Sequence, residues 1–240
     1  MKTFYSINEL NFNPEQKIYQ YVPLKYFIKL LKTGFFHINP KSFFEDFNEN
    51  QLPLKSMLPI FPVGKNVSKI SPEQIKSNLN IMNAKMYEYR QSPYKLASCW
   101  THSKIENILM WKSYAFPYGV RIETTIDKFI TSLDSSNFDI LVGKIKYGKY
   151  HFHKDILEIL FTKEKFYQDE REIRFYFIPT NIEMYNAINT GIDLRINLDN
   201  LIDNVILSPF HSLEFNQFIK SSLQSTSSLK IQYSNIKIKH

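Results

Sequence analysis

The alternation of apolar and polar residues near the start of the chain predicts a strand, a helix and a second strand. Residues 17–22, KIYQYV, read as a short strand. Apolar side chains then recur on one face of a helix that Pro23 opens and Gly34 ends. The segment FFHI at 35–38 reads as the second strand.

Further along, the pattern predicts helices and strands without a regular repeat. Helices are expected at about 71–86 and 103–115, where Ser71 and Ser103 begin capping boxes, and again at about 126–133 and 212–223. Strands are expected at 94–100, 118–123, in a strand pair spanning about 139–150, and then at 172–177, 192–198, 204–208 and 229–239. Helices cluster early and strands late, so the fold class is α+β. The proline-rich stretch at about 39–70 is a long excursion within a single domain of residues 1–240.

One strand carries charged side chains in an unusual arrangement, in the segment FYQDEREIRFYF at 166–177. Its apolar positions fall on one face of the strand: Ile173, Phe175 and Phe177. The other face takes Glu172, Arg174 and Tyr176, with Glu170 at its mouth. This is either the polar face of an ordinary half-buried strand or a pair of carboxylates aimed into a cleft. Such a pair suits reactions at a sugar carbon with oxocarbenium character.

Composition adds a bias toward polyanionic partners. The chain has 240 residues, a formal charge of +7 and a pI near 9.2, and its 43% hydrophobic content is ample for a large core. The densest basic stretch is KIKYGKYHFHK, in which Lys144, Lys146 and Lys149 interleave with aromatic residues. This mixture can bind phosphates and stack bases, and the alternative is a solvated strand face.

Cysteine and histidine give weaker indications. The single cysteine, Cys99, excludes an internal disulfide and any multi-cysteine zinc module, and no segment predicts a signal peptide or a membrane span. We therefore expect a soluble cytoplasmic protein. Cys99 with His102 as a thiol nucleophile, and His151 with His153 as a metal site, are weaker hypotheses than a buried cysteine and surface histidines. No metal is expected.

Aromatic residues at the end of one predicted helix give a further candidate site. The segment MWKSYAFPYGVRIE places Trp111 and Tyr114 where a flat ring could stack, and core packing is the alternative.

The order of these motifs resembles a bacterial family of unknown function. The shared sequence runs from the first strand and helix through SCWT and MWKSYAFPYGVRIE to EREIR, over about residues 18–208. The layout of a first strand and helix, a serine-bearing strand and a late Glu-x-Glu strand is similar to the ADP-ribosyltransferase superfamily. The resemblance implies a mixed or antiparallel split sheet flanked by helices, with NAD as substrate.

The resemblance also implies roles for individual residues. Glu172 would hold the nicotinamide ribose and promote departure of nicotinamide, and Glu170 would face the nucleophile. The first-strand Arg or His of that superfamily corresponds here to Tyr19, Gln20 or Tyr21. The rest of the NAD pocket would come from Ser98, Trp100, Trp111, Tyr114 and Arg174, with Glu172 lining a cleft beside Tyr21, Ser98 and Trp111.

The resemblance thus implies an NAD-dependent ADP-ribosyltransferase, similar to DarT-like and CmdT-like toxins of phage defence or toxin–antitoxin systems. The basic charge favours a nucleic-acid acceptor, RNA above DNA or protein, and an antitoxin or chaperone is a possible partner. The alternative is a non-catalytic module that binds nucleic acid or a protein partner. A metal-dependent nuclease would need convergent carboxylates, which the spacing does not provide.

Overall fold

The computed structural model describes residues 4–7, 13–40, 96–134, 137–148, 160–180, 191–225 and 228–238. The helix expected at 71–86, nearly all of the excursion at 39–70, and Lys149, His151 and His153 lie outside the described residues.

The secondary structure elements follow one another in mixed order. They are β1 (Phe4–Ile7), β2 (Lys17–Pro23), α1 (Leu24–Thr33), β3 (Phe35–Pro40), β4 (Leu96–Thr101), α4 (Ile108–Tyr114), β5 (Gly119–Thr125), α5 (Ile126–Ser132), β6 (Phe138–Lys144), β7 (Lys146–Tyr147), β8 (Thr162–Lys163), the 3-10 helix η4 (Lys165–Glu170), β9 (Glu172–Pro179), β10 (Ile192–Arg195), α8 (Leu198–Leu201), β11 (Asn204–Leu207), α9 (Leu213–Gln224) and β12 (Ile231–Tyr233).

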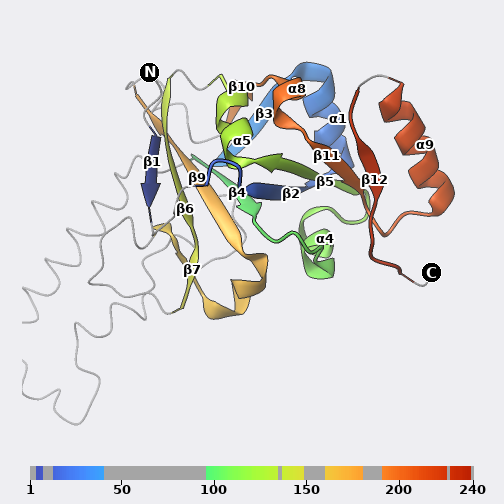
Figure 1. The fold of residues 1–240 in the computed structure, drawn as a ribbon, viewed down its shortest axis with the longest axis horizontal. Coiled ribbons are helices and arrows are strands. Elements are labelled where there is room, and N and C mark those ends of the chain that lie inside the picture. Colours follow the sequence, from blue (N-terminus) through green and yellow to red (C-terminus); the bar gives the residue numbers. More distant parts are fainter. Residues whose placement is uncertain are drawn as a thin grey trace, which may run out of the picture.

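One large sheet runs across the molecule (Figure 1), in the order β1-β6-β9-β4-β2-β5-β11-β12 with β3 and β10 joined beside β4. Most neighbours are antiparallel, and the parallel pairs β1–β6 and β11–β12 lie at its ends. β2 and β4 are joined by a single residue pair, Tyr19 with Thr101, so the sheet is nearly divided there. The expected α+β class with a mostly antiparallel sheet flanked by helices is confirmed.

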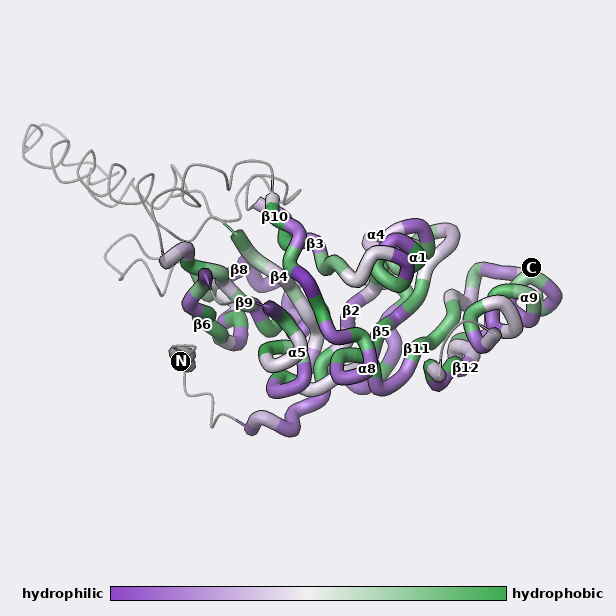
Figure 2. Tube along the Cα trace, turned by 90° about the horizontal axis from the view of Figure 1, so that it is seen from above, coloured by the Kyte–Doolittle hydropathy of each residue, from purple (hydrophilic) through white to green (hydrophobic). Residues whose placement is uncertain are grey.

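The main hydrophobic core lies on one face of the sheet, which we call the core face. Figure 1 shows α1, α5 and α8 together above β2 and β5, with α4 below these strands. Phe27 of α1 and Phe129 of α5 pack there against Trp100, Phe175 and other buried strand residues. Figure 2 shows hydrophobic residues recurring along strands such as β4 and β11. Burial of this face supplies most of the apolar stabilisation.

The first helix ends as the sequence predicts. Pro23 is the residue before α1, and Gly34 follows it in a left-handed conformation with φ 67°. The Gly34 N–H donates to the Leu30 carbonyl at 2.9 Å, which satisfies one of the open carbonyls at the helix end. Glycine has no Cβ, so it accepts this conformation without strain.

Two predicted elements are wrong in detail. α4 begins at Ile108 with Asn107 as its cap, rather than at Ser103, because Arg121 binds the carbonyls of Ser103 and Lys104 and holds that segment as a loop. The strands expected to pair within 139–150 do not pair with each other: β6 lies between β1 and β9, whereas β7 pairs with β8.

Candidate functional site

The second face of the sheet, opposite the core face, carries a row of polar side chains. Antiparallel pairing places Glu172 beside Thr101, Thr101 beside Tyr19, Tyr19 beside Glu123 and Glu123 beside Asn204. Residues at paired positions project to the same side. The row therefore crosses β9, β4, β2, β5 and β11, and two sites lie along it.

The first site, the carboxylate cluster, consists of Lys163, Glu170, Glu172, Arg174 and Tyr114. Arg174 Nε donates to Glu172 Oε1 at 2.6 Å, and Lys163 Nζ lies 3.5 Å from Glu172 Oε2. Arg174 is fully buried and the Glu172 side chain is only 5% exposed. β9 is therefore buried on both faces at this end, and Glu172 does not stand on a solvated strand face.

Glu170 reaches the same cluster from outside the strand. Arg171 has a left-handed backbone, φ 45°, so β9 begins only at Glu172 and Glu170 ends η4. Strand alternation would project the two glutamates, two positions apart, from the same face of one strand, and that expectation is wrong because Glu170 belongs to η4. Lys163 Nζ nevertheless donates to Glu170 Oε2 at 2.7 Å, and so the ammonium bridges both carboxylates.

Tyr114 closes the outer side of the cluster. Its hydroxyl donates to Glu170 Oε1 at 3.1 Å. Tyr114 is 46% exposed and the Glu170 side chain 16%, so these are the two groups of the cluster nearest to solvent. A ligand would meet Glu170 and Tyr114 before it met Glu172.

The two carboxyl groups have opposite pKa displacements. Burial raises the pKa of Glu172, but the charges of Arg174 and Lys163 outweigh it and lower that pKa to about 2; the Cys99 thiol also hydrogen-bonds to this carboxylate. Burial raises the pKa of Glu170 despite the nearby charge of Lys163. Glu172 stays ionised, whereas Glu170 can take up a proton closer to neutral pH.

Hydrogen bonds from neighbouring residues hold the carboxylate cluster in place. The Tyr147 hydroxyl accepts the backbone N–H of Glu172 at 2.7 Å. Arg174 Nη1 donates to the Leu160 carbonyl at 3.1 Å and also reaches the Tyr176 hydroxyl at 3.3 Å. These hydrogen bonds leave the Glu172–Arg174 pair little freedom to move.

Two residues predicted for the NAD pocket, Ser98 and Trp100, lie on the core face of the sheet rather than on the second face. Ser98 pairs with Phe175 and Trp100 with Ile173, so both lie on the core face. The Trp100 indole N–H donates to Ser98 Oγ at 2.9 Å, which satisfies both buried groups within the core. The expectation that Ser98 lines a cleft with Glu172 is wrong, because successive strand residues alternate between faces.

Trp111 and Tyr21 do lie on the second face, but they pack against each other. Their rings meet edge to face with centroids 4.9 Å apart. Trp111 is fully buried and its indole N–H donates to Glu106 at 3.1 Å, so it offers no open ring face for stacking. Core packing, the alternative weighed from the sequence, describes Trp111, whereas Tyr114 remains accessible.

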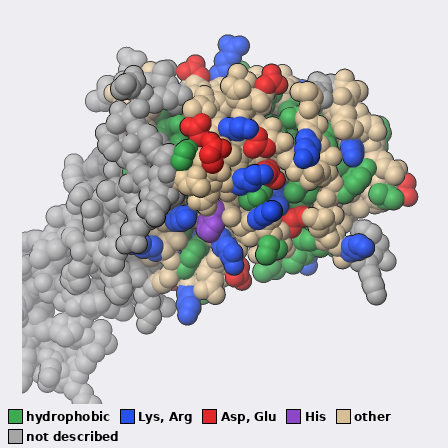
Figure 3. All heavy atoms as spheres, in the orientation of Figure 1, with side chains coloured by type: hydrophobic (Ala, Val, Ile, Leu, Met, Phe, Trp, Pro, Cys, Tyr) green, Lys and Arg blue, Asp and Glu red, His purple; other side chains and the backbone are tan. Residues whose placement is uncertain are grey.

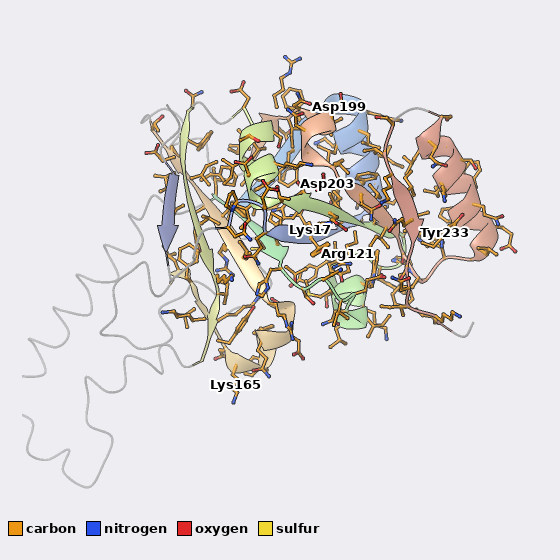
Figure 4. The ribbon with its side chains drawn as sticks, viewed as in Figure 1. Lys17, Arg121, Lys165, Asp199, Asp203 and Tyr233 are labelled. Atoms are coloured by element: carbon orange, nitrogen blue, oxygen red, sulfur yellow. The ribbon has the colours of Figure 1, made fainter. Side chains whose placement is uncertain are left out.

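The second site is a pocket of about 460 Å³ that opens between β2, β5, β11 and the C-terminal segment. Its lining is Tyr19, Lys104, Ile105, Glu106, Arg121, Glu123, Asn204, Ile206, Gln232, Asn235 and Ile236. Figure 4 shows Arg121 and Lys17 in the middle of the molecule, where β2 and β5 run side by side. Tyr19 is the one predicted cofactor residue in this lining; Glu172, three strands from Glu123, is not part of it.

The basic stretch lies at one end of the sheet. Lys144 ends β6 and is partly exposed, and Lys146 of β7 is exposed. Figure 3 shows Lys and Arg side chains intermixed with Asp and Glu on the visible face, rather than one continuous basic surface.

Sequence reasoning missed Lys163, Arg121 and Glu123. Arg121 and Glu123 stand two apart on β5, the same spacing as Glu172 and Arg174 on β9, so the segment GVRIET carried a usable signal. Lys163 stands in a two-residue strand, and no sequence pattern distinguishes it from the neighbouring Lys165.

Within the described part of the chain, no three histidine, cysteine or carboxylate side chains gather closely enough to hold a metal ion. In the same residues no helix has the length and apolar character needed to cross a bilayer. Comparison with family models, curated proteins and solved structures gives no match to this chain.

Proposed function

We propose that the chain is an NAD-consuming ADP-ribosyltransferase whose reaction centre is the carboxylate cluster. The observation that carries the proposal is the pair of carboxylates bridged by Lys163, one with a lowered pKa and one with a raised pKa. Environments that push two carboxyl pKa values apart create one permanent anion and one group able to exchange a proton.

The chemistry assigns a role to each carboxylate. The glycosidic bond between the ribose C1′ and nicotinamide breaks, its electron pair leaves with nicotinamide, and positive charge develops on the ribose. Glu172, held ionised by Arg174, stabilises that charge. Glu170 accepts the proton of the acceptor group as the new bond to C1′ forms. Tyr114 positions Glu170 through its hydroxyl.

Three further features support this assignment. Six of the residues carried over from the superfamily resemblance lie on the side of the second face, namely Tyr21, Trp111, Tyr114, Glu170, Glu172 and Arg174, whereas Ser98 and Trp100 lie on the core face. The sheet is nearly divided between β2 and β4, which agrees with a split-sheet layout. The formal charge of +7 favours a nucleic-acid acceptor, with RNA as our first choice, in a toxin paired with an antitoxin.

The proposal is tested by incubating the purified protein with NAD labelled in the adenylate half and with separate pools of RNA, DNA and protein. We expect label in the RNA pool and equimolar release of nicotinamide. Label in the DNA or protein pool would show that the acceptor is not RNA, but it would still support the proposed reaction. Absence of both label transfer and nicotinamide release from every pool would contradict the proposal.

One observation favours a second candidate, a non-catalytic module that binds nucleic acid or a protein partner. Glu172 is already neutralised by Arg174 and Lys163, and almost none of it reaches solvent. A buried ion-pair network of this kind can serve folding alone. Salt-dependent RNA binding without NAD turnover, unchanged by Glu170→Gln, would support this second function.

A further inference from the structure

The pocket beside Tyr19 contains two buried polar atoms without partners. Among the residues that the structure describes, Arg121 Nε and Asn204 Oδ1 are buried and make no hydrogen bond. Both residues line the pocket, and they are 2% and 6% exposed. Buried polar atoms are nearly always satisfied by protein or by ordered water, so two of them at one pocket call for a partner that the described protein atoms do not supply.

The donor and the acceptor are both held in place. Arg121 Nη2 donates to the Ser103 carbonyl at 2.7 Å and to the Lys104 carbonyl at 3.1 Å, and its guanidinium lies 3.9 Å from the centre of the Tyr19 ring. Asn204 Nδ2 donates to Gln232 Oε1 at 3.1 Å, which leaves its oxygen as the open atom. The pocket lining therefore contains one donor and one acceptor without partners, and because the surrounding protein covers both atoms almost fully, a ligand pairs with them after a small shift of neighbouring side chains.

The two residues are close enough to bind one small group. Arg121 pairs with Ile206 and Asn204 pairs with Glu123, so Arg121 and Asn204 are diagonal neighbours on adjacent strands. Diagonal positions on one sheet face lie roughly 7–8 Å apart, a distance that one planar group can span with two hydrogen bonds.

The two unpaired atoms argue against a simple anion, although the pocket lining carries two cations, Arg121 and Lys104. Both carboxylates of the lining are already engaged: Glu123 by Lys17, and Glu106 by Trp111, Ser234 and the backbone N–H of Asn235. An anion without a hydrogen to donate would accept from Arg121 Nε but would leave Asn204 Oδ1 without a partner. A neutral group with an acceptor beside a donor satisfies both open atoms.

We propose that this pocket binds a nucleobase through an edge that places a hydrogen-bond acceptor next to a donor. The acceptor takes the Arg121 Nε–H, and the donor binds Asn204 Oδ1. A volume of about 460 Å³ holds a nucleoside. The base can come from a free nucleoside or from a single strand of nucleic acid, and the chemistry is the same.

This inference is independent of the proposed reaction. Glu123 lies three strands from Glu172, roughly 14 Å at the usual strand spacing, so the pocket and the carboxylate cluster are separate places on the second face. Nucleoside binding in the pocket is measured without NAD turnover. If the pocket binds no nucleoside, the proposed reaction is unaffected, and if the protein does not consume NAD, the proposed nucleobase site is unaffected.

Titration calorimetry with guanosine, uridine, adenosine and cytidine, each without NAD, tests the site directly. We expect saturable binding of at least one nucleoside below about 1 mM. A single-stranded oligonucleotide of the same base distinguishes the sources: tighter binding of the strand indicates that nucleic acid is the natural ligand. No binding of any nucleoside below that concentration, or binding of inorganic phosphate instead, would overturn the proposal.

Asn204→Leu removes the open acceptor while keeping the approximate shape. It should weaken nucleoside binding by about tenfold or more, whereas Asn200→Leu in α8, outside the pocket lining, should leave it unchanged. If Asn204→Leu lowers the melting temperature strongly, nucleoside binding is measured with Ile105→Arg instead, and we expect it to be weakened. Ile105 is 77% exposed, so its substitution fills the pocket without disturbing the core. If nucleoside affinity is undiminished in whichever of these two variants folds normally, the nucleoside binds outside this pocket and the proposal is wrong.

Discussion

Substitution of Glu172 is expected to have a large effect on stability, because its side chain is buried in an ion pair. Glu172→Gln leaves Arg174 and Lys163 buried without their shared anion. Removing one partner of a buried ion pair typically costs about 3–5 kcal/mol, and we expect a loss of unfolding free energy in that range, measured by urea denaturation. Loss of activity in this variant alone would therefore not identify a catalytic role.

A double variant separates the pair from the rest of the site. Glu172→Gln with Arg174→Met removes both charges, and the Tyr176 hydroxyl still donates to the Leu160 carbonyl that Arg174 also binds. We expect the double variant to regain most of the stability lost in Glu172→Gln, because apolar replacement of a buried pair is often neutral. A double variant as unstable as Glu172→Gln would contradict this account of the pair.

The lowered pKa of Glu172 makes its contribution depend on pH. The folded-state pKa is about 2 against an ordinary value of 4.5, so the stabilisation is complete above pH 4.5 and is lost as pH falls toward 2. The difference in unfolding free energy between wild type and Glu172→Gln should be constant above this window and shrink within it. If the difference in unfolding free energy persists in full at pH 2, the charge of Glu172 is not what stabilises the folded protein.

At the scale of elements, the local signals predicted residues 17–40 well but did not predict strand β1 (Phe4–Ile7). Strand β2, helix α1 with its Pro23 and Gly34 boundaries, and strand β3 appear where periodicity and capping place them. These features depend on residues close in sequence. The order of the strands depends on long-range pairing, which periodicity cannot determine.

The candidate site was predictable only in part, for the same reason. The alternation on β9 correctly places Glu172, Arg174 and Tyr176 on one face, but Arg171 breaks the strand and moves Glu170 onto η4. Ser98 and Trp100 were assigned to the site from resemblance, although strand alternation against Phe175 and Ile173 turns them into the core. The bridging Lys163 arrives from β8 through tertiary packing alone.

Helix α4 offers a test of its capping. Asn107 accepts the Leu109 N–H at 2.8 Å, whereas the Ser103 hydroxyl donates to the Ile105 carbonyl within an exposed loop. Asn107→Ala should lower the unfolding free energy by about 1 kcal/mol, and Ser103→Ala by less than about 0.5 kcal/mol. A larger loss for Ser103→Ala would favour the capping box that the sequence suggested.

At the scale of the whole molecule, the excess of basic residues predicts salt-dependent binding of RNA. If Lys144 and Lys146 each contact a phosphate, replacing both with alanine should weaken binding and reduce the slope of log affinity against log salt by about 1.4. Lys25→Ala with Lys32→Ala on α1 makes the same change of charge at exposed positions elsewhere. Equal effects of the two double variants would mean that only net charge matters.

The central claim, that the carboxylate cluster consumes NAD, is tested most directly by nicotinamide release from Glu170→Gln. Glu170 is the more exposed carboxylate, so this variant should disturb folding less than Glu172→Gln. Glu164→Gln, the same substitution just before η4 with no capping hydrogen bond to lose, is the matched control. We predict that wild type and Glu164→Gln release nicotinamide at equal rates and that Glu170→Gln is slower by a factor of about 10²–10⁴, while its melting temperature falls less than that of Glu172→Gln. Equal release by Glu170→Gln and wild type would contradict the claim.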